Sequence, residues 1–430
     1  MNKAHNNDKR PPLLRDRNFV WLSAGSLISM TGDQFTLIAL PWLVLKMTGD
    51  PLVLGTVLAV TSIPRALFIL VGGALVDRHS PKQVLMLTKY VNTVLLAVLA
   101  TLLFADRLTL PLVYGLAFAI GLSTAFSIPA ATSITPHVIA REHLPRANGL
   151  MMGMRQLSFF AGPLLAGGLI AAFGGSGGSV EDAQGLGIAF GLDAFSFALS
   201  AWTLSKVAVR VAGEAAQARA GSVWKSVGEG LRYCWNNHDL RICFAYWAAI
   251  ALFITGPVQV AVPVLADHLG DSAAAFGLLA GAHGAGMLLG MVATGIWPRM
   301  RFGSFGMTLL AIDGAIAVLF MPLGLAGASW QAAVLLLAVG TLGGVVQIKV
   351  YTWLQQAAAP ALLGRTMALF MFIFLGIAPL SSAMTGLLMR SITLPQLFAG
   401  CGALLMVIVA ATFALTGMRS VSDISPARGA

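Results

Sequence analysis

The sequence predicts an all-α membrane protein with 12 transmembrane helices, arranged as two six-helix halves related by pseudo-symmetry. Three observations lead to this fold class: the composition, the number of long apolar segments, and a repeat that relates the two halves of the chain. Hydrophobic residues make up 57% of the 430 residues and charged residues only 10%, with a mean hydropathy of +0.82. Soluble domains carry about 25% charged residues, so the composition excludes an ordinary soluble protein.

Twelve apolar segments are long enough to cross the ~30 Å hydrocarbon core, which takes about 20 helical residues. They cover residues 18–47, 51–76, 83–104, 110–135, 147–173, 185–206, 241–267, 273–298, 304–325, 331–356, 366–389 and 396–417. The first segment follows a basic tail, as the apolar part of a signal peptide does. It is too long for one, lacks an obvious small-residue cleavage site and continues into further spans. We therefore expect it to be retained as the first helix.

The basic residues lie mostly on one side of the predicted membrane. If the N-terminus is cytoplasmic, the cytoplasmic segments hold 20 of the 27 Lys and Arg residues, and the opposite side holds only Lys46, Arg107 and Arg390. This asymmetry predicts that both termini are cytoplasmic. The net charge of +10 therefore reports topology, and we do not expect nucleic acid as a partner.

A repeat at an offset of 222 residues divides the chain into two halves. Pro41 and Gly55 match Pro263 and Gly277 without a gap. Parallel repeats of this kind build membrane transporters whose substrate site lies between the halves. The predicted organisation is a cytoplasmic tail (1–17), an N-terminal six-helix bundle (18–206), a cytoplasmic linker (207–240), a C-terminal six-helix bundle (241–417) and a cytoplasmic tail (418–430).

The linker contains one predicted helix outside the membrane. Residues 222–236 are amphipathic, with four apolar side chains on one face: Val223, Val227, Leu231 and Cys234. This pattern predicts a cytoplasmic helix or one that lies in the membrane interface.

The junction between the second and third spans reads GGALVDRHSPK. It resembles the loop between spans two and three of the major facilitator superfamily of transporters, which runs Gly, three residues, Asp, Arg, one residue, Gly and then basic residues. The matching residues are Gly73, Asp77, Arg78 and Lys82. Ser80 and Pro81 depart from the pattern.

Further stretches resemble the bacterial efflux branch of this superfamily, which includes enterobactin-exporter-like and macrolide-efflux-like proteins. They are the pair Gly32–Asp33 and residues 39–55, 136–150 and 155–168, and the resemblance covers residues 16–417. It implies the major facilitator fold and a secondary exporter in the bacterial inner membrane. By this resemblance, the protein moves a drug-like amphiphile or a siderophore outward by alternating access.

The fifth span carries a motif that resembles the Gly-Pro motif of exporters in this superfamily. Its residues are Gly162, Pro163, Gly167 and Gly168, with a gap one residue longer than the commonest form. Small residues let helices approach closely, and proline removes a hydrogen bond and permits a bend. Either an export-related hinge or ordinary close packing accounts for these residues.

Proton antiport is the expected energy source, because the chain has no P-loop of the GxxxxGK[ST] type for ATP. Drug/proton antiporters of the superfamily often carry an arginine in span four. The span Leu110 to Thr135 holds no charge, so the coupling residue has to come from another helix.

Two charged residues are expected to pair in the middle of the membrane. Asp33 lies near the middle of the first span, on a polar stripe with Ser26, Ser29 and Thr36 that we expect to face the central cavity. Arg65 lies about 18 Å before the end of the second span, at a similar depth. A charge at mid-bilayer costs at least ~2.5 kcal/mol and needs a partner or a wet cavity. The pair either couples transport to protons or is purely structural.

Other polar and aromatic residues are candidates for the cavity wall or its gate. They are Arg155 and Phe159 in span five, Thr255 and Gln259 in span seven, and Gln347, Lys349 and Tyr351 in span ten. Packing against other helices, and contact of the longer cations with lipid headgroups, are the alternatives for these residues.

Two other functions remain as alternatives. A nutrient importer or facilitator would use the same fold. A polytopic membrane enzyme would need a dyad such as His137 and Glu142, a spacing that arises easily by chance. The three cysteines show no metal-ligand spacing, and we expect no metal, no cofactor and a monomer.

Overall fold

The computed structural model describes residues 13–78, 80–174, 182–209, 223–270, 272–297, 302–359 and 362–422. Within these ranges, 12 helical segments are long and apolar enough to cross a membrane. None of the residues described there forms a strand. The all-α architecture predicted from the long apolar segments is confirmed.

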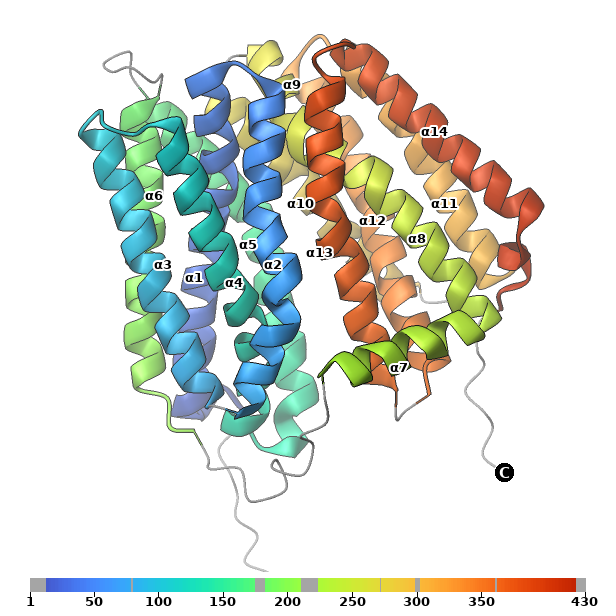
Figure 1. Ribbon diagram of the computed structural model, residues 1–430, viewed down its shortest axis with the longest axis horizontal. Coiled ribbons are helices and arrows are strands. Elements are labelled where there is room, and N and C mark those ends of the chain that lie inside the picture. Colours follow the sequence, from blue (N-terminus) through green and yellow to red (C-terminus); the bar gives the residue numbers. More distant parts are fainter. Residues whose placement is uncertain are drawn as a thin grey trace, which may run out of the picture.

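The first six spans form the bundle on the left of Figure 1. They are α1 (Arg17–Thr48), α2 (Pro51–Arg78), α3 (Pro81–Phe104), α4 (Leu110–Val138), α5 (Leu144–Phe173) and α6 (Ala183–Ser205). Local chemistry sets the ends of α1. The side chain of Asp16 accepts a hydrogen bond from the backbone N–H of Asn18 at 2.9 Å, and Gly49 ends the helix with a φ of 61°, which glycine adopts without steric cost.

The last six spans form the bundle on the right of Figure 1. The seventh span consists of α8 (His238–Gly256), a π-helical turn over Pro257–Ala261 and α9 (Val262–Gly270). The others are α10 (Ala273–Ile296), α11 (Phe305–Phe320) with a 3-10 turn (Met321–Leu325), α12 (Ser329–Ala357), α13 (Leu363–Leu388) and α14 (Leu394–Leu415).

The amphipathic helix α7 (Val223–Asn236) joins the two bundles and lies across the ends of the right-hand spans (Figure 1). We call this end of the molecule the linker side and the other end the far side. Cys234 is buried, and the hydroxyl of Tyr233 accepts a hydrogen bond from the backbone N–H of Ala359 at 3.1 Å. Leu231, which the sequence placed on the same face as Cys234, is instead exposed. The side chains of Val223 and Val227 lie outside the described residues.

Small residues set the spacing between neighbouring helices. On α10, a Cβ at Gly286 or Gly290 would lie about 2 Å from a carbonyl oxygen of α12, and Gly340 and Gly344 on α12 meet α10 in the same way. Both pairs have the Gly-xxx-Gly spacing that permits close approach of membrane helices.

Candidate functional site

The two bundles touch each other on the far side through two helix crossings, α2 with α13 and α5 with α10. At the first crossing the Cα of Gly386 would lie 3.3 Å from a Cβ at Gly55, and at the second the Cα of Gly277 would lie 2.7 Å from a Cβ at Gly167. A side chain larger than hydrogen would push the helices apart at either crossing. The bundles are therefore in direct backbone contact on this side.

Charged residues reinforce the same contact. Lys46 on α1 forms an ion pair with Asp267 on α9 at 2.9 Å, and its ammonium lies 5.0 Å from the ring centre of Trp42. Arg390, just beyond α13, pairs with Asp50, which precedes α2. The hydrogen bond from Arg390 lowers the pKa of the Asp50 carboxyl, so this pair is ionised at neutral pH. Both pairs join one bundle to the other.

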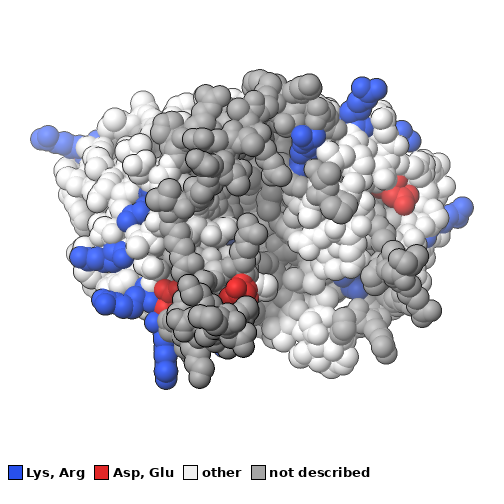
Figure 2. Space-filling view, turned by 90° about the horizontal axis from the view of Figure 1, so that it is seen from below, with Lys and Arg blue, Asp and Glu red and all other residues white. Residues whose placement is uncertain are grey.

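On the linker side the molecule is hollowed between the two bundles, as Figure 2 shows. Asp33 is exposed although it lies in the middle of α1, a helix packed against α5 and α6. Its carboxylate interacts electrostatically with Lys89 and Arg155. Arg155, also exposed, interacts in turn with Tyr351 on the opposite bundle. These residues place an acid and a base on the wall of a cavity between the halves.

Aromatic and sulfur-containing side chains complete this part of the wall. Phe159 lies one turn after Arg155 on α5 and is 40% exposed. The hydroxyl of Tyr351 points to the sulfur of Met371 at 3.8 Å, and the Tyr351 ring meets Phe370 edge to face at 5.3 Å. Such side chains adapt to ligands of different shape.

The expected ion pair between Asp33 and Arg65 is not formed. The guanidinium of Arg65 donates to Ser62 one turn earlier at 3.2 Å, and its buried Nε has no hydrogen-bond partner. Helical rise predicts the depth of Arg65 but not the direction of its side chain, because α2 packs chiefly on α4 and α13 rather than on α1.

The polar stripe on α1 does not face the cavity as a whole. Ser29 is buried and accepts a hydrogen bond from the Lys89 ammonium at 3.2 Å, while Thr36 donates to the carboxylate of Asp193 on α6. The stripe spreads over about 80° of the helix surface at 100° per residue. Asp33 is the exposed member of the stripe, and the prediction that Ser29 and Thr36 line the cavity stays a prediction.

Lys89 is the site residue that the sequence reasoning missed. It is buried on α3 and donates to Ser29 and, at 2.6 Å, to Ser200 on α6. The fully buried carboxylate of Asp193 accepts hydrogen bonds from Thr36 and Ser196. A lysine two turns into an apolar span is costly without partners, and that cost was the available signal.

Glycines on α1 allow α6 to approach this polar cluster. A Cβ at Gly32 would lie 2.5 Å from an Asp193 oxygen, and a Cβ at Gly25 would lie 2.0 Å from the Thr203 hydroxyl. The pair Gly32–Asp33 noted in the sequence thus has two roles: the glycine admits α6, and the acid faces the cavity.

The C-terminal candidates are divided between packing contacts and the cavity wall. Gln259 lies in the π turn and accepts a hydrogen bond from Ser382 on α13 at 3.1 Å. Thr255 and Lys349 are half-buried, as is Gln347, whose side-chain oxygen has no hydrogen-bond partner. The π turn and the adjacent α13 place Gln259 at the contact between two helices of one bundle. Tyr351 reaches the space between the bundles.

The span-five motif divides into two packing roles. Gly162 accommodates the side chain of Gln34 on α1, whereas Gly167 makes the crossing with α10 in the other bundle. A Cβ at Gly168 would meet nothing within 4 Å, so this glycine is not needed for packing. Pro163 is buried inside α5.

The loop motif is described only in part. The Lys82 ammonium donates to the carbonyl oxygens of Ser205 and Val207, at 3.2 and 2.7 Å, where the last carbonyls of α6 lack helical partners. The side chains of Gly73, Asp77 and Arg78 lie outside the described residues.

A family model described as "Transmembrane secretion effector", of the major facilitator type, matches residues 11–428. The chain belongs to this family of transporters. It is 21% identical over 357 residues to macrolide efflux protein A of Streptococcus pyogenes, covering 82% of this chain and 84% of that protein. It is also 27% identical over 222 residues to the multidrug efflux pump Tap of Mycobacterium tuberculosis, covering 50% of each.

Solved structures share the fold of this transporter. The nucleoside transporter NupG matches with a TM-score of 0.72 and 12% identity, covering 92% of this chain and 98% of that one. A D-xylose–proton symporter matches with a TM-score of 0.70 and 13% identity, covering 95% and 99%. The major facilitator fold predicted from the sequence is confirmed.

The family model and the relatives described above are all membrane transporters. Membership of this family identifies the protein as a transporter rather than a membrane enzyme. The ring of His137 is bonded to the carbonyl oxygen of Ser133, one turn earlier on α4, at 2.8 Å, so the histidine of the proposed dyad serves its own helix.

Proposed function

We propose that this transporter exports a small organic molecule, a drug-like amphiphile or a siderophore, by alternating access with proton antiport. The observation that carries the proposal is the position of Asp33: exposed at mid-membrane, in a cavity between two bundles whose glycine crossings lie on the far side, and flanked by Lys89 and Arg155. A carboxyl group in that place is either protonated and neutral, or ionised and balanced by a neighbouring cation. Protonation and pairing with the cation therefore compete.

The linker side is the cytoplasmic side in this proposal. Lys and Arg side chains lie around the rim of that face in Figure 2, as the positive-inside rule requires of the cytoplasmic surface. Both termini and the linker helix α7 then lie in the cytoplasm of a bacterium, with the protein a monomer in the inner membrane. The structure corresponds to a state that receives cargo from the cytoplasm.

The relatives support the proposed direction of transport, and the wall of the cavity supports the proposed class of substrate. The two curated relatives are efflux proteins for macrolides and for multiple drugs. Phe159, Tyr351 and Met371 supply apolar, deformable contact surface, and Asp33 and Arg155 supply one charge of each sign. This combination suits an amphiphile that combines an apolar body with polar groups.

The test is proton movement in proteoliposomes containing the purified protein, a pH-sensitive dye, and a panel of siderophores and cationic drugs. We expect substrate-dependent proton movement in the wild type and its loss in Asp33→Asn. The matched control is Asp313→Asn, because Asp313 is another acid of the membrane region, but one that is buried and accepts a 2.6 Å hydrogen bond from Tyr246 within the other bundle.

Three results would contradict parts of the proposal. Binding of a compound without any proton movement in the wild type would indicate a facilitator or a different coupling ion. Equal proton movement in Asp33→Asn would remove Asp33 from the coupling step. Accumulation of the substrate in the direction of the cytoplasm would indicate an importer.

A further inference from the structure

Two cavities follow one another on the linker side of the N-terminal bundle, away from the cavity between the halves. The outer one, of about 440 Å³, is lined by Arg17, Asn18, Trp21 and Lys206. The inner one, of about 10 Å³, lies between α1, α3 and α6, and a cavity of this size holds about one water molecule. Trp21 lines both cavities, so its side chain lies at the place where the two cavities meet.

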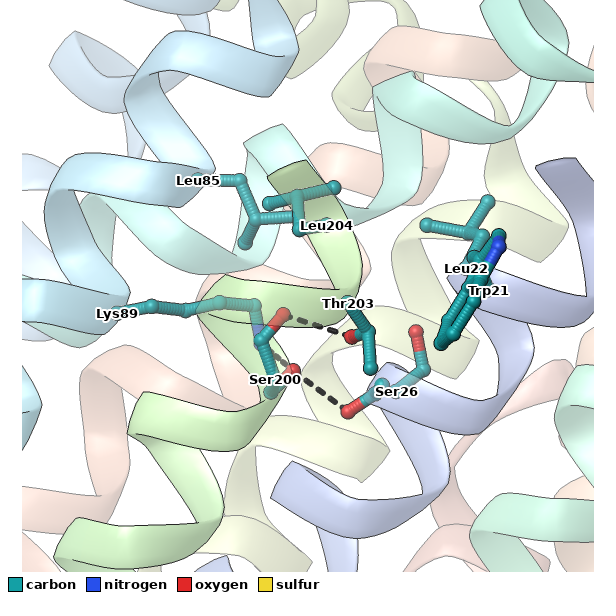
Figure 3. A pocket seen from close by; sticks show the side chains of 9 residues that line it. Trp21, Leu22, Ser26, Leu85, Lys89, Ser200, Thr203 and Leu204 are labelled. Carbon is teal, nitrogen blue, oxygen red and sulfur yellow. Dashed lines mark hydrogen bonds between the residues drawn. The ribbon is translucent and has the colours of Figure 1, made fainter. Parts of the chain in front are cut away.

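The inner cavity ends at the ammonium of Lys89 (Figure 3). Its wall is polar on one side, where Ser26, Ser200 and Thr203 contribute hydroxyl groups, and apolar on the other, where Leu22 and Leu85 lie. Ser200 accepts from Lys89 and donates to the carbonyl oxygen of Gly25, each at 2.6 Å. These hydroxyl groups form a polar file inside the bundle, in which the Thr203 hydroxyl donates to the carbonyl oxygen of Ser200. Polar groups inside a bundle need such partners.

Beyond Lys89 the polar file continues to the central cavity. Lys89 interacts electrostatically with both Asp33 and Asp193, and it donates to Ser29, which lies one helical turn before Asp33 on α1. Helix α3 packs mainly on α6 and α4. The span of α4 from Leu110 to Thr135 has no acidic or basic side chain, so the acids near Lys89 come from α1 and α6. Lys89 is thus a neighbour of both the inner cavity and Asp33, which is itself flanked by Arg155.

We propose that this file is a proton route between the linker side and Asp33 that is separate from the substrate cavity, with Lys89 as its relay and Trp21 as its outer gate. The inference rests on the proposed function, since it assigns a path to the coupled proton. In the release direction, an N–H bond of the Lys89 ammonium breaks and its proton passes to the water in the inner cavity. The amine then takes the proton of the Asp33 carboxyl group, which leaves a carboxylate beside a restored ammonium.

A separate route solves a geometric problem of antiport. A substrate that fills the central cavity covers Asp33 and excludes water from it, so the proton needs another way out as the substrate binds. The route between α1, α3 and α6 leaves that exit open.

The first test asks whether water reaches the inner cavity. Hydroxyl radicals generated from water by a short X-ray pulse label side chains next to bound water, and mass spectrometry locates the label. We expect Leu22 and Leu85, both almost fully buried, to be labelled at least tenfold more than Leu96, which is equally buried on α3 but lines neither cavity. Labelling of Leu85 no stronger than that of Leu96 would overturn the route.

The second test blocks the cavity. Ser26→Val fills it with hydrocarbon, and Ala24→Val adds the same branched side chain to α1 at a position that lines neither cavity. We expect Ser26→Val to slow substrate-driven proton movement at least tenfold, to abolish the labelling of Leu85 and to leave substrate exchange, which needs no net proton movement, unchanged. Ala24→Val should change none of these.

The outcomes separate the two proposals. Normal proton movement in Ser26→Val, or an equal fall of proton movement and exchange, would overturn the route while leaving antiport intact. No proton movement in the wild type would overturn antiport itself and the relay with it. Trp21→Ala gives an independent check, because removing the gate should increase the labelling of Leu22 and Leu85.

Discussion

Gly55 on α2 and Gly277 on α10 make the same contact from opposite halves of the molecule. They match each other in the 222-residue repeat, and each packs against a glycine of the other bundle, Gly386 and Gly167 respectively. The repeat therefore extends to the interface, where two equivalent glycine crossings hold the far side closed.

Gly167→Val should destabilise this closed arrangement. A Cβ at this position would lie 2.4 Å from the carbonyl oxygen of Ala273 on α10, and overpacking of this kind costs about 1–3 kcal/mol. The control is the neighbouring Gly168→Val, whose Cβ meets nothing within 4 Å. Thermal unfolding in detergent measures the difference, and equal melting temperatures for the two variants would contradict the crossing.

Acidification should loosen the far side through Asp50. The pKa of Asp50 is lowered by its hydrogen bond from Arg390, so its contribution to closure is complete above the ordinary carboxyl pKa of about 3.9. It is lost as the pH falls below that value toward the lowered one. A fluorophore pair across the α1–α2 and α13–α14 loops should report separation below about pH 4, and Asp50→Asn should show that separation at every pH. A wild type that stays closed under acid would contradict the role of this pair.

Lys89→Met should lower stability by about 3–5 kcal/mol, because it removes the cation that balances the buried acids. Lys89→Met combined with Asp193→Asn should recover most of that loss, since neither charge then stays unbalanced. Unfolding in detergent measures both variants. If the double variant is no more stable than Lys89→Met, the two side chains do not balance each other. On the proton route inferred above, the stable double variant still moves no protons.

Arg155→Gln and Arg65→Gln should have different effects on transport. Arg155 interacts with Asp33 and Tyr351 across the cavity, so we expect its loss to reduce transport at least tenfold. Arg65 bonds only within its own helix, to Ser62, and its replacement should leave proton coupling unchanged. Equal losses in substrate uptake by inverted vesicles would restore Arg65 as a partner in the mechanism.

The spans were predictable because each one is a long apolar segment, and membrane helices need little else. The repeat of Gly55 in Gly277 also predicted two similar halves. Rotation about each helix axis was not predictable to the required accuracy. Asp33, Ser29 and Thr36 lie within about 80° of one another on α1, yet the first faces the cavity and the other two face α3 and α6.

The same limit explains the error at Arg65 and the omission of Lys89. Depth follows from counting residues along one helix, but a partner depends on which helices are adjacent, and that is a property of the packed bundle. Lys89 is the ninth residue of α3, and Asp313 is the ninth residue of α11, where it bonds to Tyr246. Both side chains are buried, and their partners lie on other helices that the sequence alone does not place beside them.

The position of the two glycine crossings also determines how far the linker-side ends of the bundles separate when one bundle rotates slightly against the other. Both lie near one membrane surface, so they act as the fulcrum of a lever whose long arm extends toward the linker side. A rotation of about 10° there displaces the opposite helix ends by about 5 Å over a ~30 Å bilayer. Glycines let the helix backbones touch at the fulcrum, but buried side chains also meet across the interface, such as the stacked rings of Trp42 on α1 and Phe276 on α10. The rotation must shift these side chains and break the ion pairs Lys46–Asp267 and Asp50–Arg390.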